Sequence, residues 1–462
     1  MEIPETRYAK TADGVHIAFQ TFGSGDLDLL LIKGNFSNLD SNWDIAEMAD
    51  MLRRLGSFAR VIAVDRRGMG LSDPLAPGTA EPLETHIDDV IAVMAAAHVD
   101  RACVFASENA TPLAIGFAAT HPDRVQALAL YAPLPVPLAT AAAAWKDVPE
   151  QERSLLYTPE FWRGELDQRW GTPWARADYE MWVPSLAGDE AAVALWGRYV
   201  RSAASPGSAI TFIDHWLLTD VRSLYPSVQA PTLLIYRPQA RPAFIMGRLV
   251  HEAYEAIAGA RVATLRGRDF PYWFGDREEL EAELKEFFTG IPKARHLATD
   301  RVLSTVMFTD IVGSTERAAE MGDARWKELV EAHHRIVRSA LVEHRGLEMD
   351  TAGDGFYATF DGPARAVRCA LAATQAVRPL GIEIRAGVHT GEVETIDTKV
   401  GGIAVIIGAR VSALAGASEV LISSTVKDLV AGSGLAFEDA GEHELKGVPD
   451  RWRLYRVVSG QA

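Results

Sequence analysis

The sequence predicts two domains of different class: an α/β domain on a mostly parallel sheet, then a smaller α+β domain. A chain of 462 residues is too long for one ordinary hydrophobic core. In the first part, continuous apolar runs alternate with helical patterns, which favours a parallel sheet covered on both faces. In the second part, the patterns follow the order βαββαβ, which is typical of a ferredoxin-like core.

Composition narrows the class of protein and its partners. The net charge is −16, from 46 Lys and Arg against 62 Asp and Glu, which argues against a broad nucleic-acid surface but leaves room for a local cationic pocket. Two cysteines, Cys103 and Cys369, are too few for a disulfide framework. The polar, acidic start does not read as a signal peptide, and prolines interrupt the most apolar stretch. We therefore expect a cytoplasmic protein that binds neither nucleic acid nor membrane.

Five short apolar runs in the first domain read as buried strands, each ending in a turn before a helical pattern. A Trp-rich helical segment, residues 160–186, falls within an insertion at about 135–225, where a lid would lie. We expect the whole domain to span residues 1–290. The five predicted strands are residues 27–34, 59–68, 102–107, 127–133 and 231–236.

Two phrases of the first domain, "VIAVDRRGMGLSDP" and "AATHPDRVQALALYAP", resemble those of the α/β-hydrolase family, and the likeness covers about residues 5–290. That family carries its nucleophile on a sharp strand-to-helix elbow, G-x-S-x-G. Here the elbow reads "ASENA", which puts Glu108 at the nucleophile position and Ser107 one place early. A shift by one residue would point Ser107 away from the pocket.

The other two positions of the hydrolase triad also depart from the family pattern. Ala240 stands at the position of the acid, and Asp269 stands at that of the histidine. Serine-type hydrolysis is therefore disfavoured. Dehalogenases and epoxide hydrolases use a carboxylate nucleophile, so hydrolysis through Glu108 is kept as an alternative, although glutamate is longer than their aspartate. We predict a degenerate hydrolase scaffold whose pocket binds a small apolar ligand.

A polar connector, residues 291–300, leads into the second domain, which we expect at 301–462. Its first strand ends in Asp310, followed by a Gly-containing turn and a helix start whose free backbone N–H groups suit a phosphate. Asp354 occupies the tip of a Gly-Asp-Gly hairpin that would pair beside this strand. Two carboxylates at adjacent strand ends predict a site for Mg²⁺ with a nucleotide.

The motif series "FTDIVGST…GDGF…RAGVHTGEV…GARV…ELKG" resembles the catalytic domain of class III nucleotidyl cyclases over about residues 300–458. With its first domain, the chain resembles mycobacterial-type adenylyl cyclases that carry an N-terminal α/β-hydrolase domain. This resemblance implies conversion of ATP to 3′,5′-cyclic AMP and pyrophosphate. It further implies two Mg²⁺ or Mn²⁺ ions per site, held by Asp310, Asp354 and the carbonyl group of Ile311.

The resemblance assigns roles to three cations. Arg385 matches a phosphate-binding arginine, Lys446 matches the lysine on the terminal phosphates, and Arg410 matches the arginine that stabilises charge at the α-phosphate. In this family each active site combines residues of two cyclase domains. Because the chain carries one such domain, the resemblance implies a homodimer with a partner copy completing each site.

Three positions depart from the cyclase pattern. Asp350 replaces the lysine that reads adenine, Lys399 replaces its aspartate partner, and Ile406 replaces an asparagine near the arginine. Asp350 suits the N–H donors of guanine, Lys399 suits its carbonyl oxygen, and the two could instead pair with each other. ATP remains the predicted substrate and GTP the alternative. Loss of the asparagine predicts slow turnover, better with Mn²⁺, and a nucleotide-binding pseudocyclase is the further alternative.

Overall fold

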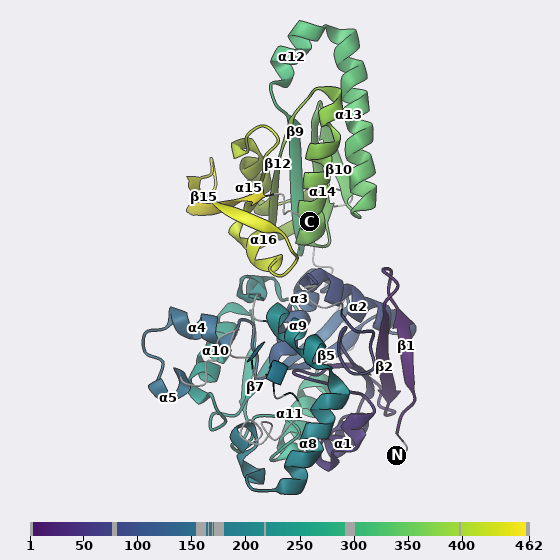
Figure 1. The fold of residues 1–462 in the computed structure, drawn as a ribbon, viewed down its shortest axis with the longest axis vertical. Coiled ribbons are helices and arrows are strands. Elements are labelled where there is room, and N and C mark those ends of the chain that lie inside the picture. The colour runs from purple at the N-terminus through teal and green to yellow at the C-terminus, as the bar shows by residue number, and fades with distance from the viewer. Residues whose placement is uncertain are drawn as a thin grey trace. The chain divides into compact units, whose positions relative to one another are not determined.

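The protein is described here by a computed structural model, which covers residues 3–75, 81–153, 163–164, 166–168, 170, 180–216, 219–291, 301–396 and 399–458. The chain divides into two compact units, Met1–Leu297 and Ala298–Ala462. Figure 1 traces both units. Apart from Ile291, the connector expected at 291–300 lies outside the described residues.

The first unit is built on an eight-stranded sheet in the order β1-β2-β4-β3-β5-β6-β7-β8. Strands β3 to β8 pair in parallel, whereas β1 and β2 form an antiparallel hairpin beside β4. All five predicted strands are present, as β3 to β7, which confirms the mostly parallel α/β sheet. The strands are β1 (Thr6–Lys10), β2 (His16–Phe22), β3 (Asp28–Ile32), β4 (Arg60–Val64), β5 (Ala102–Ser107), β6 (Val125–Tyr131), β7 (Thr232–Tyr236) and β8 (Arg261–Thr264).

Helices flank this sheet, as Figure 1 shows. Of the helices in the described ranges, α4, α5, α8 and α9 lie in the insertion between β6 and β7, where the lid is expected. Most of the Trp-rich segment at 160–186 lies outside the described residues. The helices are α1 (Ala46–Gly56), α2 (Leu83–Ala96), α3 (Thr111–Thr120), α4 (Leu138–Ala144), α5 (Glu150–Arg153), α8 (Glu190–Ala203), α9 (Pro206–Trp216), α10 (Ala243–Ala256) and α11 (Arg277–Thr289).

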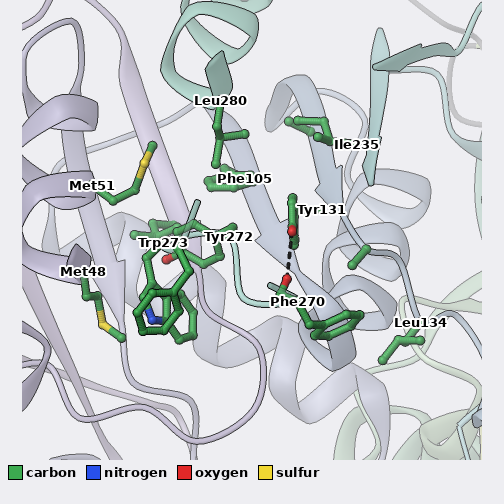
Figure 2. Close-up of a cluster of buried hydrophobic side chains, with 14 of the residues drawn as sticks. Met48, Met51, Phe105, Tyr131, Leu134, Ile235, Phe270, Tyr272, Trp273 and Leu280 are labelled. Atoms are coloured by element: carbon green, nitrogen blue, oxygen red, sulfur yellow. Dashed lines mark hydrogen bonds between the residues drawn. The ribbon is translucent and has the colours of Figure 1, made fainter. Parts of the chain in front are cut away.

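Aromatic side chains fill the core beside the carboxyl ends of the strands (Figure 2). The ring of Tyr272 contacts Phe105 of β5 edge-on at 5.2 Å and Tyr131 of β6 at 5.9 Å between centroids. The Tyr131 hydroxyl group donates a hydrogen bond of 2.7 Å to the carbonyl oxygen of Phe270. Edge-on aromatic pairs of this kind fix both the distance and the angle between the two rings. They therefore hold the segment that contains Asp269 against the strand ends.

The second unit is built on a sheet in the order β10-β11-β9-β12-β14-β16-β15, with β13 beside β12. The predicted order βαββαβ is confirmed by β9, α13, β10, β11, α14 and β12, whose strands form the ferredoxin-like core. The strands are β9 (Arg301–Ile311), β10 (Leu347–Ala352), β11 (Gly355–Phe360), β12 (Ile384–Ile396), β13 (Lys399–Gly401), β14 (Val420–Ser423), β15 (Ala436–Glu444) and β16 (Arg451–Val458). The helices are α12 (Ser314–Met321), α13 (Asp323–Glu343), α14 (Pro363–Ala376), α15 (Ile403–Leu414) and α16 (Ser424–Leu429).

Side chains of β9 alternate between two packed faces, as a strand requires. Met307 and Ile311 join the core formed with α13 and α14. Val306 and Phe308 face α15, where a Cβ atom on Gly408 would lie 2.6 Å from Val306. This alternation puts Asp310 on the α15 face, at the end of the strand.

Each helix in the described ranges is too short or too polar to cross a bilayer.

Candidate functional site

Asp310 and Arg385 face each other across the central strand pair of the second unit. They are register partners in the antiparallel pairing of β9 with β12. A guanidinium N–H of Arg385 donates to Asp310 Oδ2 at 2.8 Å, and both side chains are about one-third exposed. A second N–H of Arg385 donates to the carbonyl oxygen of Ala413 at 3.3 Å. The carboxylate of Asp310 is thus oriented by a cation while it remains open to solvent.

Asp354 lies in the turn between β10 and β11, and β11 pairs with β9. The backbone N–H of Ile311 donates to Asp354 Oδ2 at 3.2 Å. Burial and the negative charge of nearby Asp310 raise the pKa of Asp354 above its usual value, against an opposing hydrogen bond from Ser314 at the start of α12. The two predicted metal-binding aspartates are therefore brought together, next to a helix N-terminus.

This pair of carboxylates fits a hard divalent cation. Carboxylate and carbonyl oxygens are the ligands that Mg²⁺ and Mn²⁺ prefer. The mutual repulsion that raises the Asp354 pKa is relieved when a cation binds between two carboxylates. Within the described ranges, no group of three His, Cys, Asp or Glu side chains gathers into a metal site.

Helix α13 holds the hairpin turn that carries Asp354. His334 Nε2 lies 3.0 Å from the carbonyl oxygen of Gly353, the residue before Asp354. The adjacent His333 is fully buried against Phe356, and burial lowers its pKa to about 4. The sequence analysis did not identify either histidine, because their partners lie far along the chain.

Arg410 and Lys446 form a second group in this unit. Arg410 Nε donates to the carbonyl oxygen of Lys446 at 3.2 Å, and both side chains are exposed. Ile406, one turn before Arg410 on α15, is 44% exposed. Ile403 and Leu414, which share this face of the helix by their spacing, are exposed as well. The face therefore presents three large apolar side chains around one cation.

Asp350 and Lys399 are the two predicted base-reading residues, and the side chain of Asp350 is described. Asp350 lies in β10 opposite Tyr357, is exposed, and accepts a hydrogen bond of 2.9 Å from the backbone N–H of Thr351. Lys399 begins β13, and its side chain lies outside the described residues. Whether these two side chains pair is thus left as a prediction.

In the first unit, Glu108 occupies a strained elbow between β5 and α3. Its φ angle is 53°, in the left-handed region that non-glycine residues rarely adopt. The side chain is fully buried, and Oε2 accepts a short hydrogen bond from Asn35 Nδ2, whereas Oε1 has no hydrogen-bond partner among the described residues. Ser107 points elsewhere: its Oγ accepts a hydrogen bond of 2.9 Å from the backbone N–H of Gly34.

A buried lysine stands near Glu108. Lys33 Nζ donates to the carbonyl oxygen of Phe36 at 2.8 Å and to the Tyr199 hydroxyl group at 2.7 Å. The ammonium group also lies 4.5 Å from the centre of the Trp273 ring. Burial raises the pKa of Glu108 to about 7 and lowers that of Lys33 to about 7. These ionisable groups make the centre polar, and the small apolar ligand expected for this domain stays a prediction.

The remaining triad positions, Ala240 and Asp269, offer no histidine. Ala240 is buried in a turn, with its N–H bonded to the carbonyl oxygen of Arg237 at 3.1 Å. Asp269 is buried and accepts a hydrogen bond of 3.0 Å from the backbone N–H of Ser185. Within the described ranges, no histidine is hydrogen-bonded to Glu108.

Comparison with protein families agrees with the folds of both units. Residues 298–459 match the family "Adenylate and Guanylate cyclase catalytic domain", and residues 29–238 match "alpha/beta hydrolase fold". The chain joins an α/β-hydrolase-fold domain to a class III cyclase catalytic domain. The two carboxylates on β9 and the β10–β11 hairpin thus belong to the cyclase domain, and Glu108 belongs to the hydrolase-fold domain.

Individual relatives are similar over part of the chain. Putative adenylate cyclase 3 of Rhizobium meliloti is 31% identical over 32% of this chain and 27% of its own length. An uncharacterized protein of Mycobacterium bovis, Mb0915c, is 35% identical over 24% of this chain and 41% of its own. The chain thus spans less than half the length of these curated relatives.

Solved structures resemble each domain. The adenylyl cyclase CyaB from P. aeruginosa is 23% identical, with 35% of this chain and 96% of that chain covered and a TM-score of 0.33. The enol-lactonase from Burkholderia xenovorans LB400 is 19% identical, with 61% of this chain and all of that chain covered and a TM-score of 0.47.

Several side chains around the two centres were missed in the sequence analysis. In the cyclase domain these are His333 and His334; in the hydrolase-fold domain they are Lys33 and Arg66. Lys33 and Arg66 both left a signal, each as a charge at the end of an otherwise apolar run. A charged residue there interrupts the pattern of a buried strand and marks a polar site at the strand end.

Proposed function

We propose that this protein is a nucleotidyl cyclase that converts ATP to 3′,5′-cyclic AMP and pyrophosphate. The observation that carries the proposal is the meeting of Asp310 and Asp354 at adjacent strand ends, with Arg385 bonded to the first at 2.8 Å. In the reaction, the ribose 3′-oxygen replaces pyrophosphate on the α-phosphorus and loses its proton. Divalent cations bound at such a site lower the pKa of a coordinated hydroxyl group and neutralise phosphate charge.

The residues of this chain divide the work as follows. Asp310, Asp354 and the Ile311 carbonyl group hold two Mg²⁺ or Mn²⁺ ions. Arg385 orients Asp310 and lies beside the place where phosphates would bind. Arg410 stabilises charge at the α-phosphate, and Lys446 holds the terminal phosphates. Fixed cations of this kind act through electrostatic stabilisation, because they need no reorganisation during the reaction.

The choice of ATP over GTP rests on the relative described as a putative adenylate cyclase. Asp350 favours the alternative, since its exposed carboxylate can accept hydrogen bonds from guanine and not from the ring nitrogens of adenine. One carboxylate oxygen is already bonded to the backbone N–H of Thr351. We therefore keep ATP as the substrate with loose reading of the base, and GTP as the second candidate.

The active form would be a homodimer. The exposed face of α15 combines Arg410 with Ile403, Ile406 and Leu414, a set of apolar side chains typical of an interface. Turnover would be slow, because Ile406 cannot hydrogen-bond the ribose. It would be faster with Mn²⁺ than with Mg²⁺.

The hydrolase-fold domain would regulate the cyclase. Its elbow carries Glu108 in place of a serine, and no histidine is bonded to it within the described ranges. A carboxylate-nucleophile hydrolase acting through Glu108 is the second candidate for this domain. Release of product from an ester, epoxide or haloalkane, abolished by Glu108→Gln, would select it.

The decisive experiment measures cyclic-nucleotide production by the full-length protein with ATP and with GTP, in Mn²⁺ and in Mg²⁺. Asp310→Asn and Asp354→Asn should each lower the rate of cyclic-nucleotide production about 100-fold or more, because each removes a charged metal ligand. Asp361→Asn is the matched control, since Asp361 follows the opposite end of the same strand β11 and pairs with Arg365 on the surface. Nucleotide binding without turnover in any metal would indicate a pseudocyclase instead.

A further inference from the structure

Strand β10 of the cyclase domain contains a bulge immediately before Asp350. Glu348 lies opposite Ala358 of β11. Asp350 lies opposite Tyr357, so two steps along β10 correspond to one step along β11. In a regular strand, residues two apart face the same side of the sheet. The extra residue, Met349, therefore turns Glu348 and Asp350 to opposite sides.

The two sides of this hairpin face different helices. Ala358 belongs to the core formed with α13 and α14. Tyr357 stacks on Phe308 at 4.7 Å between ring centroids and within 1° of parallel, on the side that packs against α15. Glu348 therefore lies on the α13 side of the sheet. Asp350 lies on the α15 side, and the bulge is what puts it there.

On the α13 side, Glu348 is held by two partners. Arg338 of α13 donates from two nitrogens to the two carboxylate oxygens of Glu348, at 2.7 and 2.8 Å. The Thr351 hydroxyl group donates to Glu348 Oε1 at 2.6 Å, which joins the residues before and after the bulge. The hydrogen bonds from Arg338 lower the pKa of Glu348 to about 2, so the carboxylate is charged at neutral pH. A bidentate arginine pair within a network contributes more than an isolated surface ion pair.

Thr351 connects this network to Asp350. The backbone N–H of Thr351 donates to Asp350 Oδ1 at 2.9 Å. Thr351 thus binds Glu348 through its side chain and Asp350 through its backbone. The Asp350 side chain is oriented in this way while it remains exposed and able to accept further hydrogen bonds.

We propose that Glu348 is a positioning residue which, with Arg338 and Thr351, keeps the bulge formed and holds Asp350 on the side where the nucleotide base is read. This role rests on the proposed function, because it requires a purine base at Asp350. A carboxylate fixed there accepts hydrogen bonds from the N–H groups of guanine and opposes the ring nitrogens of adenine. Loss of the Glu348 contacts therefore weakens binding of the guanine nucleotide relative to the adenine nucleotide.

The test is titration calorimetry on the full-length protein with 3′-deoxy-ATP and 3′-deoxy-GTP in Mg²⁺, since both lack the attacking hydroxyl group and cannot be cyclised. Glu348→Ala should raise the ratio of the affinity for 3′-deoxy-ATP to that for 3′-deoxy-GTP about threefold, the contribution of one hydrogen bond. Glu348→Gln keeps an acceptor oxygen for Thr351 and should retain most of the wild-type ratio. A purely structural role would lower both affinities together, and an unchanged ratio in Glu348→Ala would overturn the proposal.

A double-mutant cycle tests whether Glu348 acts through Asp350. Asp350→Ala should itself raise the ratio, and Glu348→Ala added to it should cause no further change. The same effect of Glu348→Ala with and without Asp350 would overturn the proposal. Asp361→Ala is the matched control, because it breaks a surface ion pair of 2.9 Å with Arg365 beyond the other end of β11, and it should leave the ratio at the wild-type value.

Two further outcomes separate this role from the proposed function. If Glu348→Ala does not fold, Arg338→Gln removes the same ion pair from α13 and should raise the ratio in the same direction. Failure of the wild-type protein to bind either deoxynucleotide would overturn the proposed function and the role of Glu348 together. Cyclic-nucleotide production by a Glu348→Ala protein that keeps the wild-type ratio would overturn the role of Glu348 alone.

Discussion

At the scale of single residues, Glu108 combines a backbone in the left-handed region with a fully buried carboxyl group whose pKa is raised to about 7. The folded protein therefore keeps a proton on Glu108 that the unfolded chain loses at lower pH. The stability that this proton contributes is complete at low pH and is lost as the pH rises through about 7. We expect the melting temperature of Glu108→Gln to rise relative to wild type between about pH 5 and pH 7.

The matched control is Glu255→Gln, because Glu255 is an exposed glutamate on α10. The difference in melting temperature between Glu255→Gln and wild type should not change between about pH 5 and pH 7. The pKa of Lys33 is lowered to about 7, so above that pH this residue increases the stability of the folded protein as the pH rises, opposite to Glu108. The melting temperatures are therefore compared only up to pH 7. A constant difference between Glu108→Gln and wild type would show that Glu108 titrates normally.

Asp350 allows a second test at this scale. Its exposed carboxylate can accept hydrogen bonds and cannot donate them, which opposes adenine at the position where the family reads the base. Asp350→Lys should raise the ratio of kcat/KM for ATP to that for GTP by about tenfold, the cost of one unmatched polar contact. An unchanged ratio would mean that Asp350 does not contact the base.

At the scale of elements, α13 positions the turn that carries Asp354 through His334 and the carbonyl oxygen of Gly353, 3.0 Å apart. His334→Phe removes this hydrogen bond, and we expect the metal concentration for half-maximal cyclase activity to rise about fivefold. His334→Gln, which retains a donor, should restore most of the metal affinity. An equal loss in both variants would point to packing of the ring, not to the hydrogen bond.

Sequence patterns predict some of the strands and site residues and miss others. The strands β3 to β7 were predictable because buried parallel strands are continuous apolar runs. The edge strand β8 was missed, since Ala263 is its only buried residue. Asp310 and Asp354 were predictable because strand ends and a tight turn place them locally. The pairing of Lys33 with Tyr199 was not, because the two residues are 166 positions apart and meet only after folding.

At the scale of the whole molecule, the proposed homodimer predicts complementation between two inactive variants. Asp310→Asn damages the metal-binding residues, and Arg410→Ala damages the residues that a partner copy would supply to the same site. In a mixed dimer with two-fold symmetry, one site collects both substitutions and the other collects neither. Mixing equal amounts of the two variants should therefore restore about a quarter of wild-type activity, since half of the dimers are mixed and each has one intact site.

The concentration dependence of the mixture separates this outcome from contamination by active protein. Restored activity should fall when the mixture is diluted, because dimers dissociate, whereas each variant alone should stay inactive at every concentration. A useful control is Ile403→Glu, which puts a charge on the exposed apolar face of α15 without touching the metal site. Introduced into both variants, it should prevent complementation by opposing dimer formation. Full activity of the unmixed Arg410→Ala protein would place the charge-stabilising residue elsewhere, and failure of complementation in a demonstrated dimer would mean that each site is built from one chain.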